Sequence, residues 1–183
     1  MKFTIVTTVL LGLLLTPALA AYMQNEQVNQ QTAVAAGNQI LSTNRELHVA
    51  TVEQKTTHGS WKTIWNYDKH FIVTRVLPEK VCFISMMNKA EMLDFEELPM
   101  LAEESKNMKG QRRPAKEITL VTMRPVRDLR SYGPAVFTMC RGLKTYMAYE
   151  VNGRQYIGNQ ESCIRLKVLQ VLGLNYCRGN TNA

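Results

Sequence analysis

The sequence lacks the residue patterns that usually carry catalysis or bind a metal ion. Its four cysteines form no C-x-x-C pair, and it contains no G-x-S-x-G turn of the kind that presents a hydrolase nucleophile. The histidines do not have the spacing of metal ligands; they are His48, His58 and His70. These absences argue against a metal centre and against an enzyme. We therefore expect no catalytic residue, no metal and no cofactor.

Long apolar runs are absent except at the start of the chain. Met1 and Lys2 precede an apolar run over residues 3–15, and small residues of the A-x-A type end at Ala20. The run is shorter than the ~20 residues needed to cross a bilayer, so it predicts a secretory signal peptide over residues 1–20. We expect a secreted, extracellular protein with no transmembrane segment. The chain also lacks an N-x-S/T sequon, and N-glycosylation is not expected.

Acidic residues are scarce between positions 106 and 130. The chain has a net charge of +7 at pH 7, and this stretch contains many basic residues against only Glu117 and Asp128. Such a run forms either an ordinary solvated face or a site for an anionic partner, such as a sialylated or sulfated glycan or a lipid headgroup. Export from the cell argues against nucleic acid as a partner. The candidate patch consists of Lys109, Arg112, Arg113 and Lys116.

All four cysteines lie beyond the signal peptide, at Cys82, Cys140, Cys163 and Cys177. An even number of cysteines in an exported chain predicts two disulfides, for which three pairings exist. The spacing alone does not choose among the pairings. By loop entropy, a bridge from Cys82 to Cys140 would contribute roughly 4 kcal/mol, and one from Cys163 to Cys177 roughly 3 kcal/mol.

The first half of the mature chain predicts strands after a loose start. Residues 21–40 are rich in Gln and Asn and predict a loose or weakly extended segment. Alternating apolar residues and β-branched or aromatic runs then predict strands over residues 47–53, 61–65, 71–77 and 81–86. The run Asn66-Tyr67-Asp68-Lys69 predicts a turn between two of these strands.

The second half predicts two helices and further strands. Asp94 and Glu97 form a potential capping box for a helix that Pro99 delays or kinks. A second helix is predicted over residues 134–141, with proline at its start and glycine just after its end. Strands are predicted over residues 118–123, 145–151 and 162–171. The expected fold is α+β, with a mostly antiparallel β-sheet and two helices packed on it.

Several runs together resemble a BRICHOS domain. The resemblance lies in residues 65–77 (WNYDKHFIVTRVL), 80–82 (KVC), 87–89 (MNK), 139–143 (MCRGL) and 145–148 (TYMA). The opening MKFTIV, the CRG and TYM runs and the late cysteines are similar to the gastrokine family, and in particular to its third paralogue. The resemblance divides the chain into a signal peptide (1–20), a polar segment with the first strand (21–54), a BRICHOS-like domain (55–150) and a β-prone, disulfide-closed C-terminal segment (151–183).

The resemblance implies a function and a disulfide pairing. Gastrokines are secreted by gastric epithelium and are associated with restraint of epithelial proliferation, while BRICHOS domains act as chaperones against fibril formation. The family disulfide implies the pair Cys82–Cys140, and consequently the pair Cys163–Cys177. Where the family usually has a titratable Asp, this chain has Asn66, so the family's pH switch is either absent or moved to Asp68. The alternative for Asp68 is an ordinary turn residue.

A binding function also follows from strand chemistry. A sheet can bind a client strand, and the candidate client-binding face is Ile72, Val76, Phe83 and Met86, whose alternative role is ordinary core. The segment over residues 164–174 is strand-prone, and its run at residues 168–172 suits β-aggregation, so the segment is either an internal client of the domain or an edge strand. The alternative function is a mucosal signalling ligand that binds a receptor or an anionic glycan through the basic loop 106–130. The expected partners are β-prone polypeptides or a mucosal cell-surface or mucin component, with self-association allowed.

Overall fold

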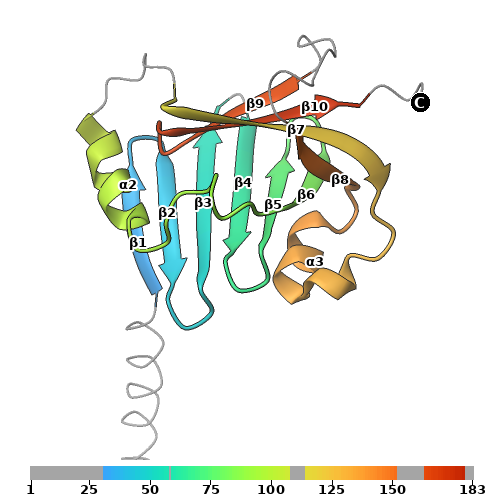
Figure 1. The fold of residues 1–183 in the computed structure, drawn as a ribbon, viewed down its shortest axis with the longest axis horizontal. Helices are drawn as coiled ribbons and strands as arrows, with labels where there is room; N and C mark the ends of the chain where they lie inside the picture. Colours follow the sequence, from blue (N-terminus) through green and yellow to red (C-terminus); the bar gives the residue numbers. More distant parts are fainter. Residues whose placement is uncertain (1–30, 58, 108–113, 152–162, 180–183) are drawn as a thin grey trace, which may run out of the picture.

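The computed structural model describes residues 31–57, 59–107, 114–151 and 163–179. The predicted signal peptide and most of the basic loop lie outside these ranges. The described chain forms ten strands and two α-helices around one sheet (Figure 1). The strands are β1 (Gln31–Ala36), β2 (Gln39–Asn44), β3 (Val49–Thr56), β4 (Gly59–Asn66), β5 (Phe71–Val76), β6 (Val81–Met86), β7 (Lys116–Pro125), β8 (Lys144–Val151), β9 (Cys163–Val168) and β10 (Leu172–Arg178). The helices are α2 (Leu98–Asn107) and α3 (Pro134–Cys140), with a short 3-10 turn at Arg130–Tyr132.

The sheet is mixed, which corrects the predicted fold class. Its strand order is β1-β2-β3-β4-β5-β6-β8-β7-β10-β9. The first six strands form an antiparallel meander, but β8 runs parallel to β6 and β10 runs parallel to β7. The fold is therefore mostly β: a curled mixed sheet, in which the two parallel pairs interrupt otherwise antiparallel pairing, with two helices packed on it. The α+β class fits only in this broad sense. Side-chain alternation predicts that a strand exists, but long connections decide its direction and its neighbour.

Both faces of the central strands are buried, and different elements cover them. In β5, Ile72 and Val76 belong to the larger core, while Phe71 and Val73 belong to a second core under α3. The larger core receives Leu98 and Ala102 of α2, and it receives the C-terminal hairpin β9–β10. Figure 1 shows α2 beside β1 and α3 below β5 and β6, while β9 and β10 cross the upper ends of the meander strands. The two helices thus cover different parts of the sheet.

Two predicted segments differ in the structure. Residues 21–40 were predicted to be loose or weakly extended, but their described part forms β1 and the start of β2, which pair with each other from Gln31 to Asn44. The strand predicted over residues 162–171 is present as β9 (Cys163–Val168) but ends earlier, because the chain turns sharply at Leu169 and Gln170 and returns as β10. Both residues have positive φ, and the Val171 N–H donates to the Val168 carbonyl at 3.2 Å. Leu and Gln rarely adopt this conformation, so the sequence gives no turn signal there.

Helix α2 begins later than the capping box predicts. The Asp94 carboxylate accepts the Glu96 N–H at 2.9 Å, and the helix begins only at Leu98. Pro99 is then its second residue, where proline costs no hydrogen bond because first-turn N–H groups lack a helical partner. The second helix, α3, begins at Pro134 after Gly133, as predicted.

Candidate functional site: a sheet face covered by its own C-terminal hairpin

Three of the four residues of the candidate client-binding face lie together. Ile72, Val76 and Phe83 are buried in the larger core and point to the same side of the sheet. Met86 lies on the other side, because it pairs with Phe71 of the second core, and its side chain is 58% exposed. Residues 83 and 86 are an odd number of positions apart along one strand, so alternation places them on opposite faces. Met86 is therefore not part of this face.

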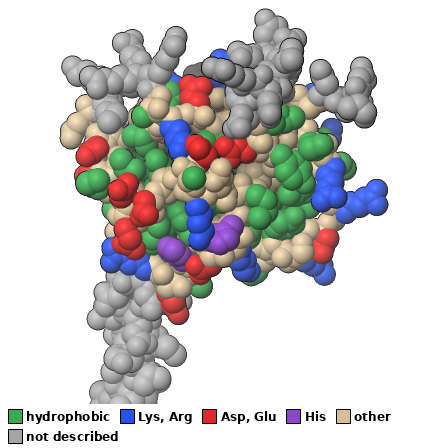
Figure 2. Space-filling model, viewed as in Figure 1, with side chains coloured by type: hydrophobic (Ala, Val, Ile, Leu, Met, Phe, Trp, Pro, Cys, Tyr) green, Lys and Arg blue, Asp and Glu red, His purple; other side chains and the backbone are tan. Residues whose placement is uncertain are grey.

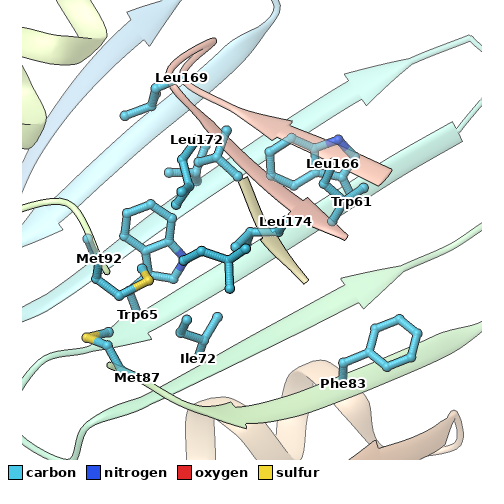
Figure 3. Packing of buried hydrophobic residues seen from close by; sticks show 14 of the residues in the cluster. Trp61, Trp65, Ile72, Phe83, Met87, Met92, Leu166, Leu169, Leu172 and Leu174 are labelled. Atoms are coloured by element: carbon cyan, nitrogen blue, oxygen red, sulfur yellow. The ribbon is translucent and has the colours of Figure 1, made fainter. Parts of the chain in front are cut away.

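The C-terminal hairpin covers this face. Tyr176 of β10 stacks on Phe83, with ring centroids 4.4 Å apart and an angle of 10° between the ring planes. The apolar side chains that the hairpin contributes are fully or almost fully buried; they are Leu166, Val168, Leu169, Leu172 and Leu174. Figure 3 shows the leucines of the hairpin packed over Trp61, Trp65 and Ile72. A strand pair of the chain itself therefore covers the predicted client-binding face.

A chain of polar side chains runs through this core. The Trp65 indole Nε1–H donates to Thr63 Oγ1 at 3.0 Å, and Thr63 and Thr74 share a 2.9 Å hydrogen bond. Thr74 in turn lies 2.7 Å from the hydroxyl of Tyr176, which joins the meander to β10. Burial raises the pKa of Tyr176 to about 12. Because each of these buried groups has a partner, the network positions the hairpin at little cost in desolvation.

A buried glutamine also holds the turn of the hairpin. The Gln39 Nε2 donates to the Lys167 carbonyl at 2.6 Å and to Gln54 Oε1 at 2.9 Å, and Gln39 Oε1 accepts the Leu169 N–H at 2.8 Å. The Gln39 side chain is only 1% exposed. The Gln39 side chain thus provides hydrogen-bond partners for the Lys167 carbonyl and the Leu169 N–H at the turn of the hairpin. The burial of Gln39 could not be predicted from the sequence, because Gln39 lies in a polar stretch and a single glutamine carries no signal for burial.

Both disulfides form the pairs that the resemblance implies. Cys82 of β6 is bonded to Cys140 of α3, and both residues are completely buried within the second core. Cys163 and Cys177 are bonded across neighbouring positions of β9 and β10. The first bridge fixes α3 to the sheet, and the second closes the open end of the covering hairpin.

The residues at the altered acidic position lie in the turn between β4 and β5. Asn66 Oδ1 accepts the Lys69 N–H at 2.7 Å, so this side chain stabilises the turn. The Asp68 carboxylate lies 2.9 Å from His48 Nδ1, and the His48 ring packs on the edge of Phe95. Figure 2 shows the histidines at the lower edge of the molecule, where the hairpin turns of the meander lie. Asp68 therefore connects the β4–β5 turn, in which it lies, to His48 in the β2–β3 turn.

The predicted basic patch is described only in part. Lys109, Arg112 and Arg113 lie outside the described residues. The Lys116 ammonium lies 2.7 Å from the Glu91 carboxylate and donates to the Ala90 carbonyl at 3.1 Å. Lys116 thus ties the start of β7 to the segment before α2.

Among the described residues, no group of three or more His, Cys, Asp or Glu side chains is arranged to hold a metal ion. Within the same residues, no helix has the length and apolarity to cross a membrane.

Comparisons with known proteins agree with this architecture. The BRICHOS domain matches residues 57–147. Gastrokine-1 of Homo sapiens is 36% identical over 180 residues, covering 97% of each chain, and Gastrokine-1 of Sus scrofa is 36% identical over 183 residues, covering 98% of each. Gastrokine-3 of Homo sapiens is 26% identical over 183 residues, covering 97% of each chain. These identities do not favour the third paralogue over the first. No solved structure matches the chain. The chain belongs to the gastrokine family of BRICHOS-domain proteins.

Proposed function

We propose that this chain is a secreted protein of the gastric mucosa that shields β-prone segments of other polypeptides from aggregation and restrains epithelial cell proliferation. Membership of the gastrokine family supports the location and the effect on growth. One structural observation supports the shielding: the sheet face of Ile72, Val76 and Phe83 is covered by a β-hairpin of the chain itself.

The covering hairpin indicates what the face can bind. The contacts at the face combine apolar burial with the stacking of Phe83 on Tyr176 and the hydrogen bond from Thr74 to Tyr176. An extended client with alternating apolar and aromatic side chains offers the same groups. Such a client would bind when the hairpin leaves the face. β9 is the last strand of the sheet, so the start of the strand-prone segment 164–174 is an edge strand. Its role as an internal client is part of this proposal.

An amyloid growth assay tests the shielding. The oxidised protein, at a substoichiometric ratio to a fibril-forming peptide, should lengthen the lag phase followed by thioflavin fluorescence. The variant Gln39→Ala, which loses the hydrogen bonds that hold the hairpin turn, should lengthen the lag further than the wild type. Gln31→Ala on exposed β1 is the matched control and should behave as the wild type. The shielding proposal fails if neither wild type nor Gln39→Ala delays fibril growth.

Secretion and growth restraint need separate measurements. Expression in epithelial cells should release the chain into the medium with an N-terminus at Ala21, as Edman sequencing would show.

Purified oxidised protein added to gastric epithelial cells should lower the rate of DNA synthesis with increasing dose. Protein reduced and alkylated at its cysteines is the control and should have no effect. Equal growth with and without the oxidised protein would remove this part of the proposal.

A further inference from the structure

A large cavity lies at one end of the curled sheet. Its volume is about 1140 Å³, and its walls come from β6, β7, β8, β9 and β10. It lies where β6 and β8 begin and where β7 and β10 end. In Figure 3, Phe83 lies apart from Met87 and Met92 and marks the end of the core that borders this cavity.

An irregular strand pairing borders the cavity. The register of β7 against β8 shifts between Thr122 and Pro125. No helix among the described residues lines the opening. Side chains of the larger core form the inner wall, among them Phe83 and Tyr176.

The inner wall of the cavity is apolar and aromatic. Phe83, Tyr146, Ile164 and Tyr176 line it. Tyr146 lies beside Phe83 because the two residues are partners in the β6–β8 pair. Tyr146 and Ile164 are only partly buried and pack against the core, so each has apolar surface that a ligand can cover. An alkyl chain would gain about 0.8 kcal/mol for each methylene that it buries there.

The rim of the cavity is mainly cationic. Arg124 at the end of β7 and Lys144 at the start of β8 line it, and both side chains are exposed. Arg178 also lines the cavity, and Glu79 is the one acidic residue among the described lining residues. Lys144 is the pairing partner of Val81, which places it on the same side of the sheet as the apolar wall. The site thus combines an apolar interior with positive charge at its opening.

We propose that this cavity binds a single-chain fatty carboxylate, with the alkyl chain along the aromatic wall and the carboxylate between Arg124 and Lys144. The volume of about 1140 Å³ slightly exceeds the range of about 300–1,000 Å³ typical of small-molecule pockets, so it leaves room for a long alkyl chain. A neutral lipid would bring no negative charge to Arg124 and Lys144. A small inorganic anion would leave the apolar wall of the cavity exposed to water. The site shares Phe83 and Tyr176 with the sheet face under the hairpin, whereas its cationic rim, Arg124 and Lys144, takes no part in the proposed client shielding.

Fluorescence titration with a dansyl-labelled undecanoate tests the site in the oxidised protein. The dansyl emission should rise and shift to the blue with one saturable site per chain. Dodecanoate should displace the probe, and dodecanol should do so at least fivefold less well, since exposed ion pairs contribute about 0.2–1 kcal/mol each. Absence of saturable binding, or equal displacement by dodecanol and dodecanoate, overturns the proposal.

Variants locate the ligand at the rim. The double variant Arg124→Gln with Lys144→Gln should weaken dodecanoate binding roughly fivefold and leave dodecanol binding unchanged. Both substitutions are at exposed positions, so folding should be retained, as far-UV circular dichroism would show. The matched control, Lys69→Gln with Lys89→Gln, removes the same charge at the opposite end of the sheet and should bind like the wild type. Equal losses in the two double variants would mean that net charge alone attracts the ligand, which contradicts the assigned site.

Discussion

The side chain of Gln39 accepts a hydrogen bond from the backbone N–H of Leu169, a residue 130 positions later in the chain, at 2.8 Å. The same side chain donates to the Lys167 carbonyl at 2.6 Å. One amide near the start of the sheet therefore holds the turn of the hairpin that ends it. Leu169 is only 1% exposed, so water cannot replace this partner.

Loss of the Gln39 amide should destabilise the protein more than an ordinary surface substitution. Gln39→Ala leaves the Leu169 N–H and the Lys167 carbonyl buried without this partner, and each such group costs about 1–3 kcal/mol. We expect the free energy of unfolding in urea to fall by about 2–4 kcal/mol. Gln31→Ala, at an exposed position of β1, should change it by less than about 0.5 kcal/mol. Similar values for the two variants would refute the role assigned to Gln39.

The two disulfides should contribute unequally to stability. The Cys82–Cys140 bridge spans 58 residues and the Cys163–Cys177 bridge spans 14, so loop entropy favours the first by about 1 kcal/mol. The double variant Cys82→Ala with Cys140→Ala also empties a fully buried site, whereas Cys163 is partly exposed. We expect a larger fall in the melting temperature for the first pair. A larger fall for the tail pair would contradict this ranking.

The turn of the covering hairpin offers a route to a more stable protein. Gln170 has a φ of 61°, a left-handed conformation that costs a residue with a side chain about 1–2 kcal/mol. Gln170→Gly removes most of this cost but increases the entropy of the unfolded chain. We expect a net gain of about 0.5–1 kcal/mol in the free energy of unfolding. Gln54→Gly, in the regular strand β3, should instead lower it, and a loss of stability in both variants would count against the observed turn.

Stability should fall at alkaline pH through Tyr176. Tyrosines of the unfolded chain ionise near the ordinary pKa of 10.0, while burial keeps folded Tyr176 neutral up to about 12. A raised folded pKa means that this stabilisation is complete below about pH 10 and is lost as the pH rises toward 12. Between about pH 9 and 11, the wild type should lose about 1 kcal/mol more than Tyr176→Phe. Tyr149→Phe, at an exposed position, serves as the control and should follow the wild type. Parallel curves of unfolding free energy against pH for the wild type and Tyr176→Phe would rule out a buried phenol.

Much of the central meander could be predicted from local pattern. The alternating and β-branched runs predicted β3 to β6 close to their observed bounds, and Asn66 marked the turn that its side chain does stabilise. Proline and glycine at the two ends predicted α3. These features depend on residues near one another in the chain, which is why the sequence reveals them.

The C-terminal hairpin could not be predicted in the same way. Leu169 and Gln170 carry no turn signal, so the apolar run around them resembled one continuous strand. Side-chain alternation could have placed Met86 on the opposite face from Phe83. The burial of Gln39 could not be predicted, because its main-chain partners Lys167 and Leu169 lie more than 100 residues away.

The sequence by itself determined the family, the cysteine content and most of the strands, because these depend on composition, motifs and short-range periodicity. Only the tertiary structure decided that β8 and β10 enter the sheet in parallel and that the last hairpin covers the face of Ile72, Val76 and Phe83. The physical reason is that strand partners and buried hydrogen bonds join residues distant in the chain. A local pattern predicts which side chains will be buried, but the packing of the whole chain decides which residues bury them.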